Sequence, residues 1–170
     1  MRTRVQQVFG EGLITGIIGY GAVVLFFAGQ NLLAGQSPFH TPAVLGAPLV
    51  QGTPADQEVV AAVFAYNGLH LLVFIVVGMM AAWIVTRIER QPSLWYLGFF
   101  VFFLIFAYDL VLLLMVTGPE GEPGWASILA ANGLAVLAMG GYLWAIHRGL
   151  WEEIRQRGDP EETADPPTPS

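Results

Sequence analysis

The sequence predicts an all-α integral membrane protein that folds as an antiparallel bundle of four transmembrane helices. Of its 170 residues, 55% are hydrophobic and only 12% are charged, which is too apolar for an ordinary soluble domain of this length. The apolar residues gather in four segments. Each segment is long enough to cross about 30 Å of hydrocarbon at a rise of about 1.5 Å per residue.

The distribution of arginine orients these segments. All seven cationic side chains are arginines, and they precede the first segment, separate the second from the third and follow the fourth. The other two connections carry no Lys or Arg. Because cationic residues in short loops mark the cytoplasmic side, we expect both termini in the cytoplasm. The arginines are Arg2, Arg4, Arg87, Arg90, Arg148, Arg155 and Arg157.

The spans are expected at about 13–33, 59–86, 94–116 and 125–146. Arg2 and Arg4 ahead of the first span could also begin a signal peptide, but the apolar run is longer than usual for one. No Ala-x-Ala-like cleavage site follows within 31–38. The second span exceeds the hydrocarbon thickness, so it should tilt or extend past the outer surface.

The connection between the first two spans, about 34–57, is expected to form an outer cap. Its four prolines lie too close together for a long helix, yet the apolar Phe39, Val44 and Leu49 would be poorly placed in a solvated loop. We therefore predict that it folds over the outer mouth of the bundle, with one short helical turn near 43–46.

The C-terminal part completes a single four-span domain, 1–157, followed by a tail. Residues 147–157 alternate apolar and charged side chains in the pattern of an amphipathic helix at the inner surface. Residues 158–170 are acidic and rich in proline, so we expect them to be disordered.

Several function classes are disfavoured by the composition. The absence of cysteine excludes disulfides, thiol catalysis and Cys-based metal sites. The acidic residues behind the net charge of -6 are scattered, and no basic patch for nucleic acid exists. Ser127, His70 and Asp109 supply the residue types of a hydrolase triad, but no G-x-S-x-G motif accompanies them. No motif requires an enzyme, a metal or a cofactor, so a non-enzymatic role is favoured.

Polar residues inside the spans are the candidates for function. Asp109 lies in the third span, where an unpaired carboxylate costs about 2.5–3.5 kcal/mol on insertion scales. His70 on the second span and Asn132 on the fourth are expected at a similar depth, about 10 Å below the outer edge. Tyr66 and Asn67 share one helical face with His70. The candidate ligand-binding or proton-handling residues are His70, Asp109, Asn67, Asn132, Tyr66 and His40, the last in the outer cap.

Three readings of this polar cluster remain open. It can order the helices of a non-enzymatic accessory or scaffold protein through hydrogen bonds, or form a small ligand-binding bundle. A His70–Asp109 pair can instead handle protons or hold a lipid-soluble ligand such as a quinone. An oligomeric channel or carrier is the third reading. Haem is disfavoured, because His40 lies in a loop and His147 at the opposite surface. In the inner half of the predicted spans, the only polar side chains that could join a site are Thr15, Tyr20 and Tyr142.

Small residues indicate how the helices pack. Gly12 and Gly16 form a G-x-x-x-G step on the first span, and Ala131 and Ala135 lie on a small-residue surface of the fourth. We expect these two helices to pack closely, although one such surface could pair with another subunit. The expected partners are thus the lipid bilayer and either a second copy of the chain or a larger membrane complex. A prokaryotic plasma membrane is the simplest location.

Overall fold

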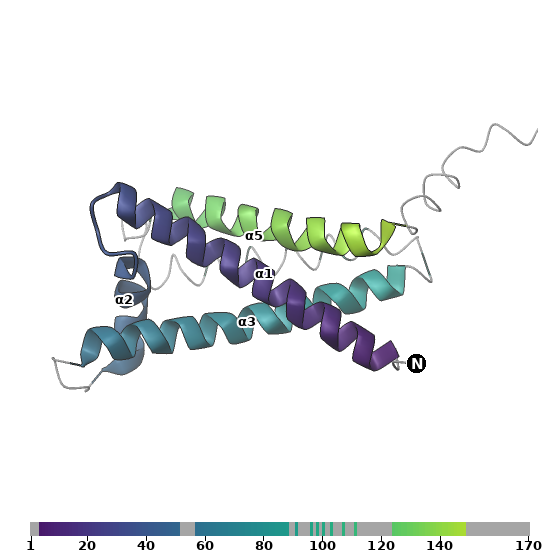
Figure 1. The fold of residues 1–170 in the computed structure, drawn as a ribbon, viewed down its shortest axis with the longest axis horizontal. Coiled ribbons are helices and arrows are strands. Elements are labelled where there is room, and N and C mark those ends of the chain that lie inside the picture. Colours follow the sequence, from purple (N-terminus) through teal and green to yellow (C-terminus); the bar gives the residue numbers. More distant parts are fainter. Residues whose placement is uncertain are drawn as a thin grey trace, which may run out of the picture.

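A computed structural model describes residues 4–51, 57–88, 91, 96, 98, 100, 103, 107, 111 and 124–148. Within these ranges every regular element is helical, which confirms the predicted all-α class. The elements are α1 (Arg4–Leu33), α2 (His40–Gly46), the 3-10 helix η1 (Ala47–Val50), α3 (Glu58–Ile88) and α5 (Trp125–Ile146). Three long helices run side by side, and α2 lies across one end of them (Figure 1). We call this end the cap end.

Three of the helices are long and apolar enough to cross a membrane: Gln6–Leu33, Glu58–Ile88 and Trp125–Ile146. They coincide with the first, second and fourth predicted spans. The predicted third span, 94–116, lies largely outside the described residues, but those described from Tyr96 to Val111 are helical. Most of the predicted amphipathic segment 147–157 and the whole tail 158–170 also lie outside the described residues.

The connection between α1 and α3 folds over the bundle end through α2 and η1. Helical structure there extends from His40 to Val50, further than the single turn expected near 43–46. Pro48 lies at the start of η1, where a missing backbone N–H removes no helical hydrogen bond. Gly46 lies so close to α3 that a Cβ atom would collide with the Ala62 carbonyl. The absence of a side chain at Gly46 thus allows the cap to rest on the α3 backbone.

Glycines bring the backbones of α1 and α3 into contact where the two helices cross. A Cβ atom on Gly16 would lie 2.5 Å from the Phe74 carbonyl oxygen, and one on Gly12 would lie 2.5 Å from Cα of Met79. On the facing helix, a Cβ atom on Gly78 would collide with the Gly12 carbonyl and the Gly16 nitrogen. The partner of Gly12 and Gly16 is therefore α3 and not the last helix, because Gly78 offers the complementary small residue.

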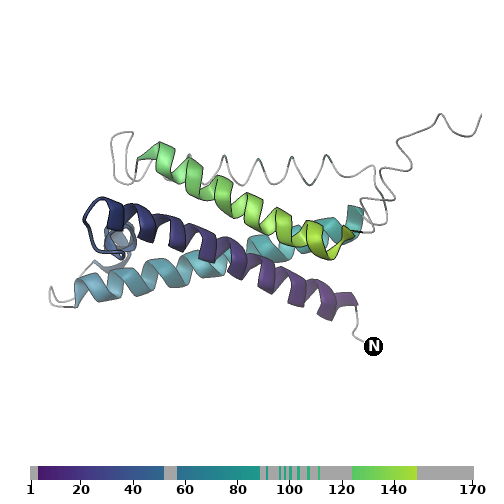
Figure 2. The same cartoon turned by 45° about the horizontal axis from the view of Figure 1, so that its top comes forward.

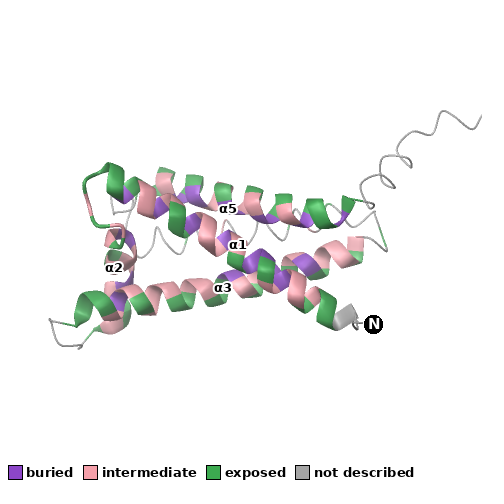
Figure 3. Ribbon diagram, viewed as in Figure 1, coloured by how far each residue is buried: buried purple, intermediate pink, exposed green. Residues whose placement is uncertain are grey.

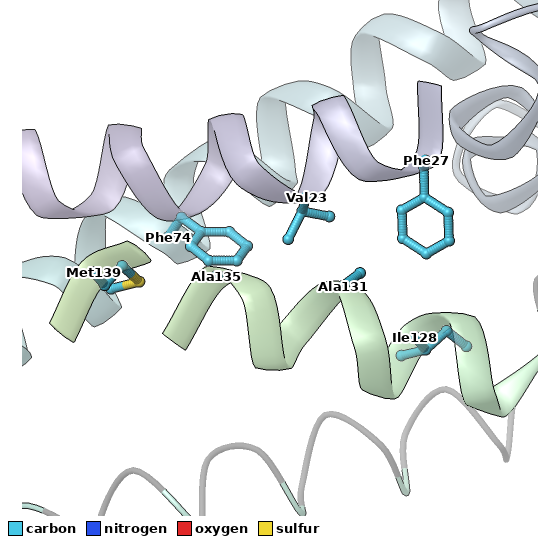
Figure 4. Close-up of a cluster of buried hydrophobic side chains, with 7 residues drawn as sticks. All are labelled: Val23, Phe27, Phe74, Ile128, Ala131, Ala135 and Met139. Atoms are coloured by element: carbon cyan, nitrogen blue, oxygen red, sulfur yellow. The ribbon is translucent and has the colours of Figure 1, made fainter. Parts of the chain in front are cut away.

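The first and last helices do pack on each other, closer to the cap end. α1 lies between α3 and α5 (Figure 2). Ala131 and Ala135 of α5 are almost fully buried, in one apolar cluster with Val23 and Phe27 of α1 (Figure 4). The cluster also includes Phe74, Ile128 and Met139. Buried residues follow the seams between helices, whereas the outward faces are largely exposed (Figure 3).

Replacing Gly16 with alanine should destabilise the bundle, because the added methyl group overlaps the α3 backbone. We expect the free energy of unfolding to fall by about 1–3 kcal/mol, as for other overpacked contacts. Thermal unfolding followed by circular dichroism in detergent micelles measures this. Gly21→Ala is the matched control, because a Cβ atom there meets nothing within 4 Å. Equal stability of the two variants would contradict the backbone contact.

Candidate functional site

The polar face of α3 that the sequence singled out points toward α1. The Tyr20 hydroxyl donates a hydrogen bond of 2.8 Å to Oδ1 of Asn67. Nδ2 of Asn67 donates in turn to the Val63 carbonyl at 2.8 Å, one turn earlier on α3. Asn67 therefore has a partner for each end of its amide, and one of these bonds joins two helices.

Tyr20 is the hydrogen-bonding member of this site that the sequence analysis missed, and the ring of Phe74 was not expected there either. The position of Tyr20 along the first predicted span placed it in the inner half of the membrane, at a different level from the candidate residues. Gly16 lies against Ile75, and continuing one turn along each antiparallel helix brings Tyr20 to the level of His70. The glycine pattern could have revealed this register if Gly78 had been recognised as the partner of Gly12 and Gly16.

Three aromatic rings surround the His70 imidazole. Tyr66 stacks on it with ring centroids 5.1 Å apart and an interplanar angle of 17°. Phe74 meets it edge-on at 5.1 Å, and Tyr20 lies tilted to it at 6.4 Å. Aromatic pairs at such distances add to the stabilisation from burial. We call Tyr20, Tyr66, Asn67, His70 and Phe74 the His70 cluster.

One buried polar atom of this cluster makes no hydrogen bond to the described residues. Nε2 of His70 is buried and has no hydrogen-bond partner among the described residues. Depending on the tautomer, this nitrogen is either a donor or an acceptor, and either form needs a partner when buried. Leaving it unsatisfied costs about 1–3 kcal/mol. The ring neighbours supply apolar contacts but no polar atom for Nε2.

Among the other candidates, Asn132 makes no hydrogen bond to the cluster within the described part of the chain. Asp109 lies outside the described part of the chain, so its pairing with His70 stays a prediction. Asn132 is half-buried on α5. It follows Ser127, which contacts Gln30 of α1, by five residues, and this distance along the helix places it near the level of Tyr66. His40 lies in α2, at the cap end of the bundle.

His40 lines a separate pocket of about 180 Å³ at the cap end. Nε2 of Gln30 donates a hydrogen bond of 2.6 Å to the Ser127 hydroxyl there, which ties α1 to the start of α5. Thr41 donates at 3.0 Å to Oδ1 of Asn31, which ties α2 to α1. Ser127 thus lines the cap pocket and is separate from the His70 cluster. The pocket is lined by Gln30, Asn31, Ala34, Gln36, His40, Thr41, Val44, Gly124 and Ser127.

The opposite end of the bundle holds another cross-helix pair. Nε2 of His147 lies 3.2 Å from Oε2 of Glu11, and both side chains are largely buried. Gln7 donates to the other carboxylate oxygen of Glu11 at 2.9 Å, and the Thr15 hydroxyl donates to the Glu11 carbonyl at 2.7 Å. Glu11 was not singled out from the sequence, although Gln7, Glu11 and Thr15 follow the i, i+4 spacing of one helix face.

The three histidines thus lie at three levels: His40 at the cap end, His70 inside the bundle and His147 at the other end. Within the described ranges, no three His, Asp or Glu side chains gather as a metal site would require. No protein-family model, curated protein or solved structure matches the chain.

Tyr20→Phe tests the cross-helix bond of the His70 cluster. Losing the hydroxyl should lower the free energy of unfolding by about 0.6–2 kcal/mol, the range for hydrogen bonds between membrane helices. A double-mutant cycle with Asn67→Ala isolates the coupling of the two side chains. Tyr142→Phe is the control, because no described hydrogen bond involves that hydroxyl. Independent effects of Tyr20→Phe and Asn67→Ala in the cycle would contradict the bond.

Proposed function

We propose that this chain is a non-enzymatic, multi-pass membrane protein that binds a small lipid-soluble ligand at the His70 cluster. The observation that carries the proposal is the buried Nε2 of His70, which lacks a hydrogen-bond partner among the described residues. A bound molecule with one polar group would satisfy that atom. The rings of Tyr66, Phe74 and Tyr20 would contact the apolar part of the same molecule.

The outward faces of the helices support a place within a bilayer. Leu25, Phe64 and Leu137 are each exposed over more than 70% of their surface, one on each long helix. On α5, the exposed Trp125 and Trp144 are nineteen residues apart, which corresponds to about 28 Å of helix. This separation matches the hydrocarbon thickness, and indoles concentrate at both of its boundaries.

The same geometry suggests how deep the His70 cluster lies. Trp83 lies near the end of α3 and Trp144 near the end of α5. These two helix ends lie at the same end of the bundle (Figure 1), so we assign both tryptophans to the same boundary of the bilayer. His70 lies thirteen residues before Trp83, or about 20 Å away along the helix. That leaves about 10 Å to the boundary on the cap side. A site at this depth lies within the hydrocarbon layer, so a lipid-soluble ligand suits it.

The neighbours of His70 indicate the chemistry of the ligand. Its described ring contacts are Tyr20, Tyr66 and Phe74, none of which is charged at neutral pH. An uncharged molecule with a flat ring and a carbonyl or hydroxyl group would suit these surroundings, and quinones have both features. The positions of the arginines favour an orientation in a plasma membrane with both termini in the cytoplasm and the cap outside. The His70 cluster would then lie in the outer half of that membrane.

A scaffold or accessory role is the second candidate, and the polar pairs favour it. Each described cross-element bond joins α1 to another helix: Tyr20 to α3, Asn31 to α2, and Gln30 and Glu11 to α5 or its C-terminal end. Such bonds specify which helices are neighbours. A channel is less well supported, because α3 carries no polar side chain between His70 and Thr86.

His70→Phe separates the two candidates, because phenylalanine keeps the ring contacts and removes Nε2. We expect the wild-type protein, purified from native membranes, to carry about one apolar small molecule per chain, identified by mass spectrometry. The variant should lose that molecule while remaining as stable or about 1 kcal/mol more stable. His40→Phe, at the cap pocket, should retain the molecule. The same bound lipids on wild type and His70→Phe would favour the scaffold role.

Asp109→Asn tests the predicted His70–Asp109 pair. If Nε2 of His70 binds the ligand without help from a carboxylate, the variant should keep both its fold and its bound molecule. The free energy of unfolding should change by less than about 1 kcal/mol, because the amide keeps most hydrogen bonds of the acid. Loss of the molecule from a folded Asp109→Asn protein would instead identify the pair as the working group.

A further inference from the structure

Two helices end in the same aromatic and cationic pair. On α3, Cζ of Arg87 lies over the Trp83 ring, 5.1 Å from its centroid. At the end of α5, Cζ of Arg148 lies over the Trp144 ring at 5.9 Å. Both distances fall within the range of cation–π attraction. In each pair the arginine follows the tryptophan by four residues, so the two side chains share one face of the helix.

The contact with tryptophan fixes the position of each guanidinium along the helix axis. Helical side chains lean toward the N-terminus, so each arginine lies back over a tryptophan about 6 Å nearer the bundle centre. An unattached arginine at a helix end would extend outward into water. The indole instead holds the cation at its own level, where tryptophans meet the polar headgroups of a bilayer.

Neither guanidinium has a carboxylate partner in the described part of the chain. That part carries only two carboxylates, Glu11 and Glu58. Glu11 contacts His147 and Gln7, and Glu58 begins α3 at the cap end. Trp83 and Trp144 are each exposed over about half of their surface, and both arginines are exposed. Within the described residues, each pair is thus a guanidinium that rests on an indole and has no carboxylate partner.

We propose that the two Trp–Arg pairs are binding sites for the phosphate groups of anionic phospholipids in one leaflet. The planar guanidinium donates two parallel hydrogen bonds to phosphate, and the indole contacts the glycerol and upper acyl region of the same lipid. The proposal rests on the membrane placement given above. That placement puts both pairs at the cytoplasmic boundary, where anionic lipids concentrate.

A lipid phosphate fits these sites better than a free phosphate ion. Both pairs lie at the ends of α3 and α5 that Figure 1 shows at one end of the bundle. On the same helices, the exposed side chains toward the bundle centre include the apolar Val76 and Met80 of α3 and Leu137 of α5. A phospholipid satisfies the cation and covers the apolar face at once, whereas an inorganic ion satisfies only the cation. The chain as a whole is acidic, with a net charge of -6, so general attraction to anionic lipid is not expected.

The test compares the thermal unfolding of the full-length protein in nanodiscs of phosphatidylcholine alone and in nanodiscs of equal phosphatidylcholine and phosphatidylglycerol. Phosphatidylglycerol should raise the unfolding midpoint of the wild type by about 3 °C. Arg87→Gln combined with Arg148→Gln should abolish most of that rise. Trp83→Leu and Trp144→Leu should each reduce it while leaving the charge unchanged. Arg155→Gln combined with Arg157→Gln, which removes the same number of charges beyond the spans, should retain it.

Two results would overturn the proposal. An equal loss of the rise when Arg155 and Arg157 are both changed to Gln would mean that the effect follows net charge. An equal rise with inorganic phosphate in phosphatidylcholine nanodiscs would mean that the lipid is not required. If the double arginine variant does not fold, the two tryptophan variants still decide between these results. The ligand of the His70 cluster is assayed separately, by mass spectrometry, so failure of either proposal leaves the other intact.

Discussion

The backbone contact between α1 and α3 is the constraint on which the rest of the structure depends. Gly12 and Gly16 on one helix and Gly78 on the other leave no side chain at the crossing, so the two backbones touch. Apolar side chains give little preference for one helix over another in lipid, where the tails are equally apolar. A close backbone approach gives direct van der Waals contact, and it fixes the register of α1 along α3.

That register decides which polar groups meet. Tyr20 reaches Asn67 because it lies one turn beyond the Gly16 contact, and the same turn brings its ring beside His70. Polar groups within apolar helices need partners inside the protein or in a ligand, since the surrounding lipid offers none. The partner that Asn67 finds on α1, and the one not found for Nε2 of His70 in the described part, follow from this single alignment.

α1 is the common partner in the described bundle. It contacts α3 through glycine, α5 through Ala131 and Ala135, and α2 through Asn31. The bonds from Gln30 to Ser127 and from Glu11 to His147 hold the two ends of α5 against it. A central helix with a different kind of contact on each side explains how three similar apolar helices take defined positions.

The sequence by itself determined the all-helical class, the positions of three helices apolar enough to cross a membrane, the presence of a cap and the shared face of Tyr66, Asn67 and His70. These properties depend on hydropathy and on the local periods of 3.6 residues, which neighbouring residues encode. Only the tertiary structure decided that Gly12 and Gly16 face α3, that Tyr20 joins Asn67 and that Glu11 meets His147. Those contacts join segments that are 47 to 136 residues apart, and they depend on the pairing and register of helices. Pairing and register follow from the complementary shapes of distant surfaces, which no local pattern in one segment specifies.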